Sequence, residues 1–151
     1  MRRMKLLIVD DEHVICESLT NILKQHEQIE VIGTCHDGED AIESIKNNQP
    51  DIVFLDIRMP GMSGIEVAGA LEKWDDPPLV IFISAYDDYA LKAFEVNALD
   101  YILKPFDADE INRVIQKIDK LFSKTAKIKY QESQPKPGYQ HQYPVQFCFY
   151  R

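Results

Sequence analysis

Short apolar runs alternate with segments of helical periodicity along the first 124 residues, and this alternation constrains the fold most strongly. Most of the runs are continuous and rich in β-branched residues, as in strands buried on both faces of a parallel sheet. They are LLIV at 6–9, IEVIG at 29–33, DIVFL at 51–55, LVIFI at 79–83 and YIL at 101–103. The repeated alternation predicts an α/β fold with a doubly wound, five-stranded parallel sheet. The clearest helical stripe follows the last run, at 111–122.

Composition excludes several classes of function. A length of 151 residues fits one domain, and 17 basic against 25 acidic residues give a net charge of −8. That charge repels a phosphate backbone, so we expect no direct binding of nucleic acid. The three cysteines are widely spaced and lack zinc-ligand spacing, and the apolar run near the N-terminus is too short to span a membrane. We therefore expect a cytoplasmic protein with reduced thiols.

The end of the chain differs in composition from the rest. Residues 1–124 hold 13 basic and 24 acidic residues, whereas 125–151 hold 4 and 1, with three prolines and many Gln and Tyr residues. The pattern of helical spacing stops after Lys124. We expect one domain at 1–124 and a linker or flexible tail at 125–151. The alternative is that the segment YPVQFCFYR adds a strand or docks on a partner, because its aromatic residues are costly to expose.

Acidic, basic or hydroxyl side chains that could take part in chemistry follow four of the five predicted strands. Strand one is followed by Asp10 and Asp11, strand three by Asp56, strand four by Ser84 and strand five by Lys104. In the doubly wound order 2-1-3-4-5, strand two lies at an edge and strands one and three are neighbours. Taken singly, each residue could be a cap, a loop residue or a surface charge. Together they indicate one crevice at the carboxyl edge of the sheet.

Three neighbouring carboxylates repel one another and tend to protonate unless a cation compensates their charge. Oxygen ligands at a half-open site suit Mg²⁺, which keeps several waters. A carboxylate beside a metal and a lysine has what a nucleophile needs to accept a phosphoryl group. Asp56 is therefore a candidate phosphorylation site, with Lys104 neutralising charge on the phosphoryl oxygens and Ser84 donating a hydrogen bond to one of them.

The motifs LIVDDE, DIVFLDIRMPGMSG, VIFISAYDD and DYILKPF resemble the receiver domain of two-component response regulators, which has a flavodoxin-like (βα)5 fold. The resemblance covers residues 4 to about 124. The stretch SAYDDYALKAFEVNALDYILKPF is similar to receivers of the LytTR-type (LytR/AlgR-like) regulators, which attach a DNA-binding output domain. Because 27 residues are too few for that domain, we expect either an excised receiver or a regulator lacking a DNA-binding output. DNA would be reached only through the missing domain.

The resemblance implies a phosphorylation and metal site. Asp56 matches the phospho-accepting aspartate, and Asp10 and Asp11 match the acidic pair that binds Mg²⁺, with Mn²⁺ as a substitute. Asp11 is expected to contact the ion directly. The main-chain carbonyl of Arg58 matches the third protein ligand.

The resemblance also implies a switch. Ser84 matches the switch Ser/Thr, Lys104 the lysine that engages the phosphoryl group, and Tyr101 the switch aromatic. Pro105 matches a proline whose peptide bond is commonly cis in the family.

The implied partner is a sensor histidine kinase, whose phosphohistidine gives its phosphoryl group to Asp56. The receiver is not a conventional enzyme, although it catalyses its own phosphorylation and dephosphorylation. We expect a homodimer through a surface made by the predicted helix near 90–94, the strand at 101–103 and the helix at 111–122. Arg58 and Tyr86 lie two residues beyond Asp56 and Ser84, and we expect them to tune the lifetime of the phosphorylated state.

Two alternatives use the same residues differently. An aspartate phosphohydrolase of the haloacid dehalogenase kind also uses an Asp, a Ser/Thr, a Lys and magnesium, but generally needs an Asp where this chain has Arg58. A pseudo-receiver would serve as a binding module without phosphorylation. All the functional positions are filled here, which argues against a pseudo-receiver.

Overall fold

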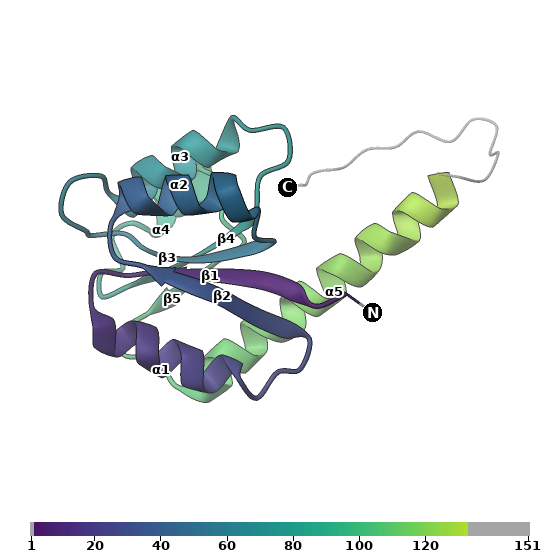
Figure 1. Ribbon diagram of the computed structural model, residues 1–151, viewed down its shortest axis with the longest axis horizontal. Helices are drawn as coiled ribbons and strands as arrows, with labels where there is room; N and C mark the ends of the chain where they lie inside the picture. Colours follow the sequence, from purple (N-terminus) through teal and green to yellow (C-terminus); the bar gives the residue numbers. More distant parts are fainter. Residues whose placement is uncertain (1, 133–151) are drawn as a thin grey trace. The chain divides into compact units, whose positions relative to one another are not determined.

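The computed structural model describes residues 2–132, and the chain divides into two units after Phe106. The first unit holds a five-stranded, wholly parallel sheet (Figure 1). Its strands are β1 (Met4–Val9), β2 (Ile29–Cys35), β3 (Ile52–Asp56), β4 (Leu79–Ser84) and β5 (Asp100–Leu103). Their order is β2-β1-β3-β4-β5, which confirms the predicted doubly wound sheet.

Helices of this unit cover both faces of the sheet, which explains why the strands are continuously apolar. They are α1 (His13–Leu23), α2 (Gly38–Asn48), α3 (Gly64–Glu72) and α4 (Ala90–Glu95). Figure 1 shows α2 and α3 on one face and α1 on the opposite face. Every residue of the central strand β3 is buried. Leu7, Val53 and Leu55 pack in one cluster with residues of α2, α3 and α4, and the intervening strand residues are buried on the other face.

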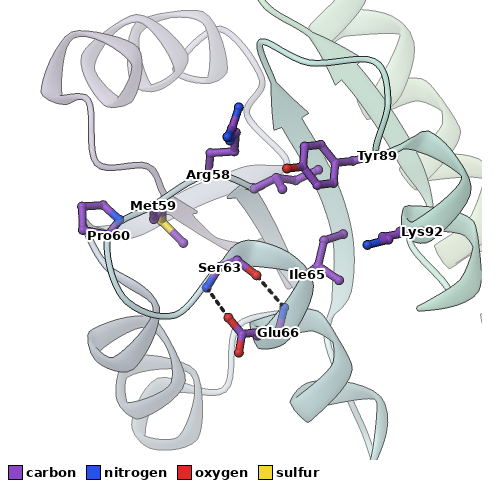
Figure 2. Close-up of a pocket in the computed structure, with 9 residues that line it drawn as sticks. Arg58, Met59, Pro60, Ser63, Ile65, Glu66, Tyr89 and Lys92 are labelled. Carbon is purple, nitrogen blue, oxygen red and sulfur yellow. Dashed lines mark hydrogen bonds between the residues drawn. The ribbon is translucent and has the colours of Figure 1, made fainter.

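Two helices of the first unit begin at the polar residues expected of N-caps. The Asp37 carboxylate accepts a hydrogen bond from Asp40 N at 2.8 Å at the start of α2. At α3, Ser63 Oγ accepts from Glu66 N, and Glu66 Oε1 accepts from Ser63 N, which forms a capping box (Figure 2). These caps fix where each helix leaves the carboxyl edge of the sheet.

The second unit contains helix α5 (Ala108–Glu132). Its apolar stripe includes the buried residues Ile111, Val114, Ile115 and Ile118, as the helical spacing predicts. The helix continues to Glu132, beyond Lys124, where the pattern of helical spacing stops. No Gly or Pro interrupts the sequence between the helix start and Pro135, so the backbone can stay helical after the apolar spacing ends.

The division into a domain at 1–124 and a tail stays a prediction. The segment YPVQFCFYR, for which a strand or a docking role was the alternative, lies outside the described residues. Within residues 2–132, no helix is both long enough and apolar enough to cross a membrane.

Candidate functional site

The ends of two neighbouring strands, β1 and β3, bring the predicted acids together. Asp10 directly follows β1 and Asp56 is the last residue of β3, and these strands are paired, with Val9 opposite Leu55. Asp10 and Asp56 are buried, whereas Asp11 is partly exposed. One carboxylate oxygen from each of the three acids lies within 4.8 Å of the others. The crevice expected from the strand ends therefore has three converging carboxylates.

The close return of the chain after β3 holds Asp56 in place. Gly64 N donates to Ile57 O at 2.7 Å, so the β3–α3 connection folds back on the strand end. A Cβ at Gly64 would overlap the carbonyl oxygen of Asp56 and lie 2.9 Å from Ile57 Cα. Only glycine fits this approach without moving the backbone that carries Asp56.

Only one of the two carboxylate oxygens of Asp10 accepts a hydrogen bond. Its Oδ1 accepts a hydrogen bond from Glu12 N at 2.9 Å. Its Oδ2 lies 2.9 Å from Lys104 Nζ, but this ion pair lacks the angles of a hydrogen bond, and the buried atom has no hydrogen-bond partner among residues 2–132. A buried carboxylate oxygen of this kind fits a cation ligand, and an all-oxygen donor set suits Mg²⁺.

Burial and like charge make Asp56 a weak acid. Burial raises the pKa of its carboxyl group to about 7, the charge of Asp10 adds to this effect, and the nearby Lys104 ammonium opposes it. A hydrogen bond that the protonated Asp56 donates to Asp11, together with the charge of Asp11, raises the pKa further. Asp56 therefore holds its negative charge poorly without a compensating cation. This electrostatic state is the second observation that fits a divalent metal.

Lys104 supplies the positive charge of the site. Its Nζ lies 2.9 Å from Asp10 Oδ2, 2.9 Å from Glu12 Oε1 and 3.6 Å from Asp56 Oδ2. Burial alone would lower the pKa of Lys104, but the hydrogen bond to Glu12 and the negative charges of Asp10 and Asp56 raise it above its usual value. The ammonium is therefore firmly charged. The following Lys104–Pro105 peptide bond is cis, the geometry that the resemblance implies.

Ser84 and Tyr101 are connected through the backbone of Tyr86. Ser84 is fully buried at the end of β4, and its Oγ accepts a hydrogen bond from Tyr86 N at 3.1 Å. The Tyr101 hydroxyl donates to the carbonyl oxygen of Tyr86. Burial raises the pKa of the Tyr101 phenol, which keeps this donor protonated. A displacement of Ser84 would therefore act on the same loop that holds the Tyr101 hydroxyl.

The two residues expected to tune lifetime are in contact. The Arg58 guanidinium carbon lies 4.4 Å from the centre of the Tyr86 ring, a cation–π geometry, and the Tyr86 ring meets Tyr89 edge to face. Figure 2 shows Arg58 and Tyr89 at the rim of a groove of about 570 Å³. The groove lies between the β3–α3 connection and α4 and is lined by Ile57, Arg58, Met59, Pro60, Ser63, Ile65, Glu66, Tyr89 and Lys92.

Sequence reasoning missed two contributions to the site. Glu12, the third acid of the VDDE motif, binds Lys104 through its side chain and Asp10 through its backbone amide. His36 Nδ1 donates to Asp10 O at 2.9 Å, and the His36 ring packs on His13 with centroids 3.9 Å apart. The run of three acids was a signal for Glu12. The sequence places His36 at the end of the second strand, which offers no group comparable to the acids, and the contact with Asp10 was not predicted.

Comparison with known proteins identifies this arrangement. Residues 6–116 match the response regulator receiver domain family. The chain is 46% identical over 96 residues to the sensory transduction protein LytT of Bacillus anthracis and 42% identical over 95 residues to the transcriptional regulatory protein BtsR of Salmonella typhi. These matches cover 64% and 63% of this chain but only 39% of each relative. The likeness to LytT is consistent with the LytTR-type subgroup that the sequence motifs resemble.

Solved structures give the same result. The response regulatory domain of protein mrkE from Klebsiella pneumoniae superposes with a TM-score of 0.76 at 34% identity, over 80% of this chain and 99% of that domain. The REC domain of AraT, a response regulator from Geobacillus stearothermophilus, has a TM-score of 0.76 at 30% identity, over 82% and 98%. The range 6–116 that matches the family spans the positions of the three acids, Ser84 and Lys104. This chain therefore belongs to the response regulator receiver domain family of two-component systems.

Proposed function

We propose that Asp56 accepts a phosphoryl group from the phosphohistidine of a sensor histidine kinase. The observation that carries this proposal is the position of Asp56, a buried carboxylate that shares a 4.8 Å cluster with Asp10 and Asp11 and lies 3.6 Å from the Lys104 ammonium. In this reaction a carboxylate oxygen of Asp56 forms a bond to phosphorus while the bond from phosphorus to the histidine nitrogen breaks. The receiver contributes position and electrostatics, and in this sense it catalyses its own phosphorylation.

The metal that fits this site is Mg²⁺, with Mn²⁺ as a substitute. Asp10, Asp11, Asp56 and the main-chain carbonyl of Arg58 would hold it. The buried Oδ2 atom of Asp10, which has no hydrogen-bond partner among residues 2–132, supports this assignment. When bound, the ion would offset the charge of the carboxylates and of the phosphoryl oxygens. Lys104 would supply the second positive charge, and the Ser84 hydroxyl would donate a hydrogen bond to a phosphoryl oxygen.

Switching would begin at Ser84 and reach Tyr101. If Ser84 turns its hydroxyl to the phosphoryl group, its contact with Tyr86 N changes, and the Tyr86 carbonyl is the acceptor of the Tyr101 hydroxyl. Tyr101 would then rotate inward. A local change of charge at Asp56 would thereby alter the protein surface around Tyr86 and Tyr101.

Hydrolysis of the acyl phosphate would be limited by access of water. The contact between the Arg58 guanidinium and the Tyr86 ring supports a shielding role for both residues. Their side chains would slow the approach of water in line with the phosphoryl group. Arg58 would therefore have two roles. Its side chain would lengthen the lifetime of the acyl phosphate, and its main-chain carbonyl would bind the metal.

The partners follow from the proposed chemistry. We expect a cytoplasmic location, a sensor histidine kinase as phosphoryl donor, and DNA contact only through an output domain outside this chain. Homodimerisation would use a surface with contributions from α4, β5 and α5. In the first unit, the exposed apolar side chains Leu91 and Phe94 of α4 and Leu103 of β5 support this surface.

Incubation with acetyl phosphate tests the proposed acceptor. With Mg²⁺ present, intact mass spectrometry should find one added phosphoryl group on the wild type and on a control, Asp75→Asn, which removes an exposed acid. Asp56→Asn should gain none, and omission of Mg²⁺ should abolish the gain in the wild type. An unmodified wild type would favour the pseudo-receiver alternative, and repeated hydrolysis of a phosphate monoester would favour the phosphohydrolase.

A further inference from the structure

Glu12 does not belong to the cluster of Asp10, Asp11 and Asp56, but its side chain binds Lys104. Its Oε1 lies 2.9 Å from Lys104 Nζ and accepts a hydrogen bond, while its side chain stays 60% exposed. The Lys104 side chain is only 10% exposed. The contact therefore joins an exposed acid to the buried cation that serves the proposed phosphoryl acceptor.

The distances show which acid holds the ammonium. Lys104 Nζ lies 2.9 Å from Glu12 and from Asp10, but 3.6 Å from Asp56, beyond the usual range of about 2.7–3.2 Å for N–H···O hydrogen bonds. Two acids that receive no phosphoryl group thus hold the lysine more closely than the acid that would receive one. Of these two, Asp10 also belongs to the carboxylate cluster, whereas Glu12 has no partner in that cluster except through Lys104 and its own backbone amide.

We propose that Glu12 is a positioning residue that restrains Lys104 on the β1 side of the site, away from Asp56, before phosphorylation. This inference rests on the proposed function of Asp56. For Lys104 to engage a phosphoryl group on Asp56, its ammonium must weaken or leave its contact with Glu12. The carboxylate of Glu12 therefore competes with the phosphoryl oxygens for the same cation and slows phosphorylation.

The effect should be modest and sensitive to salt. Exposed ion pairs contribute little because water and ions screen them, so loss of the pair should raise the rate by about two- to fivefold. Screening becomes stronger as ionic strength rises, with a Debye length of about 10 Å at 0.1 M and about 3 Å at 1 M. A merely structural role of Glu12 predicts no such dependence on salt.

Phosphorylation rates with acetyl phosphate and Mg²⁺ test the restraint. Glu12→Gln keeps the size of the side chain and removes its charge, and Glu12→Ala removes the acceptor as well. Both variants should be phosphorylated about two- to fivefold faster than the wild type at low salt, and their advantage should shrink at high salt. Glu17→Gln, which neutralises an exposed acid on helix α1, which begins directly after Glu12, should match the wild type. Rates of the Glu12 variants equal to or below that of the wild type would overturn the proposal.

A second measurement does not depend on phosphorylation. Side-chain NMR of ¹⁵N-labelled protein should show the Lys104 ammonium protons exchanging faster with water in Glu12→Ala than in the wild type or in Glu17→Gln. Unchanged exchange would overturn the restraint even if the rates differed. Failure of the proposed function has another signature, because the wild type would then remain unmodified on Asp56 whatever residue stands at position 12.

Discussion

Asp56 combines burial with the repulsion of two neighbouring acids, and this combination is costly for a folded protein. Burial and the charge of Asp10 raise the pKa of its carboxyl group to about 7, although Lys104 opposes them. A site that only ended a strand would gain nothing from this arrangement. In the proposed function, a metal ion would offset the unfavourable charge, and Asp56 would accept the phosphoryl group.

The raised pKa of Asp56 predicts a dependence of stability on pH. In metal-free buffer, the folded protein keeps a proton on Asp56 up to about pH 7, whereas the unfolded chain loses it near the ordinary pKa of 3.8. Wild-type stability should therefore fall between these values, relative to Asp56→Asn. Between pH 3.8 and pH 7, the stability of the wild type relative to the variant should fall by about 2–4 kcal/mol in total. Urea unfolding at pH 5.5 and pH 8 with EDTA checks this, with Asp75→Asn as control, and a difference that does not change with pH would contradict it.

The contact between Arg58 and Tyr86 predicts a change in phosphoryl lifetime. Arg58→Ala and Tyr86→Ala should each lose phosphate about two- to fivefold faster, the effect expected for loss of one exposed cation–π pair and its shielding. Arg58→Ala keeps the main-chain carbonyl assigned to the metal. Intact mass measured over time after removal of acetyl phosphate gives the rates. Lys92→Ala, which removes a neighbouring surface cation from the same groove, should decay like the wild type.

The residues of the site differ in how far the sequence could predict them. Asp10, Asp56 and Ser84 were found because their places depend only on where strands end and which strands are neighbours. The role of Glu12 depends on a side chain reaching back from the β1–α1 loop to Lys104, which is 92 positions away in the chain. Spacing carries no information about such a contact. The His36 contact with Asp10 was missed for the same reason.

Among the elements, the β3–α3 connection has the strictest demands. Gly64 permits the close return of the chain onto Asp56, and the capping box of Ser63 and Glu66 starts the next helix. The Pro-Gly turn and Ser63 are visible in the sequence, so the start of α3 was predictable. The need for glycine at position 64 was not, because it arises from a contact between backbone segments.

Two glycines in α3 should respond to alanine in opposite ways. Gly64→Ala should destabilise the protein by more than about 2 kcal/mol, because its Cβ meets the backbone of Asp56 and Ile57. Gly69→Ala should stabilise it by about 0.5–1 kcal/mol, because a Cβ there meets no atom within 4 Å and alanine favours a helix interior. Chemical denaturation of the two variants measures both changes. Equal effects would show that the close return at Asp56 does not constrain position 64.

Helix α5 shows the limit of periodicity as a signal. Apolar spacing predicted the buried stripe from Ile111 onward but not the end of the helix at Glu132. The periodicity of apolar residues shows which face of a helix is buried. The helix can extend beyond the last of these residues wherever no Gly or Pro stops it. The absence of a breaker before Pro135 was the better guide to its end.

At the scale of the whole molecule, the order of the strands decides which residues can work together. Because β1 and β3 are neighbours and β2 lies at the edge, acids 46 positions apart in the chain, Asp10 and Asp56, reach one cluster. Alternating strands and helices predicted this order, since parallel α/β sheets of this kind have few topologies. The chain spans 39% of the length of LytT and BtsR, so activities of a whole regulator remain proposals.

The exposed apolar residues of α4 predict association that depends on phosphorylation. Leu91 and Phe94 are 72% and 79% exposed, which is costly for a surface without a partner. With beryllofluoride and Mg²⁺ as a phosphoryl mimic, light scattering should detect dimers at high protein concentration. Phe94→Ser should remain monomeric under these conditions, whereas Val14→Ser, at an exposed apolar residue of α1, should dimerise like the wild type. An unchanged mass of the wild type on addition of the mimic would contradict this prediction.

The most direct test of the whole account is to locate the phosphoryl group. Wild-type protein phosphorylated with acetyl phosphate and Mg²⁺ can be reduced with sodium borohydride, which converts an aspartyl phosphate to homoserine. Tandem mass spectrometry of the peptides should then find homoserine at position 56 and an unmodified aspartate at Asp10 and Asp11. Homoserine at either of these acids, or none at position 56, would contradict the assignment of Asp56 as the phosphoryl acceptor.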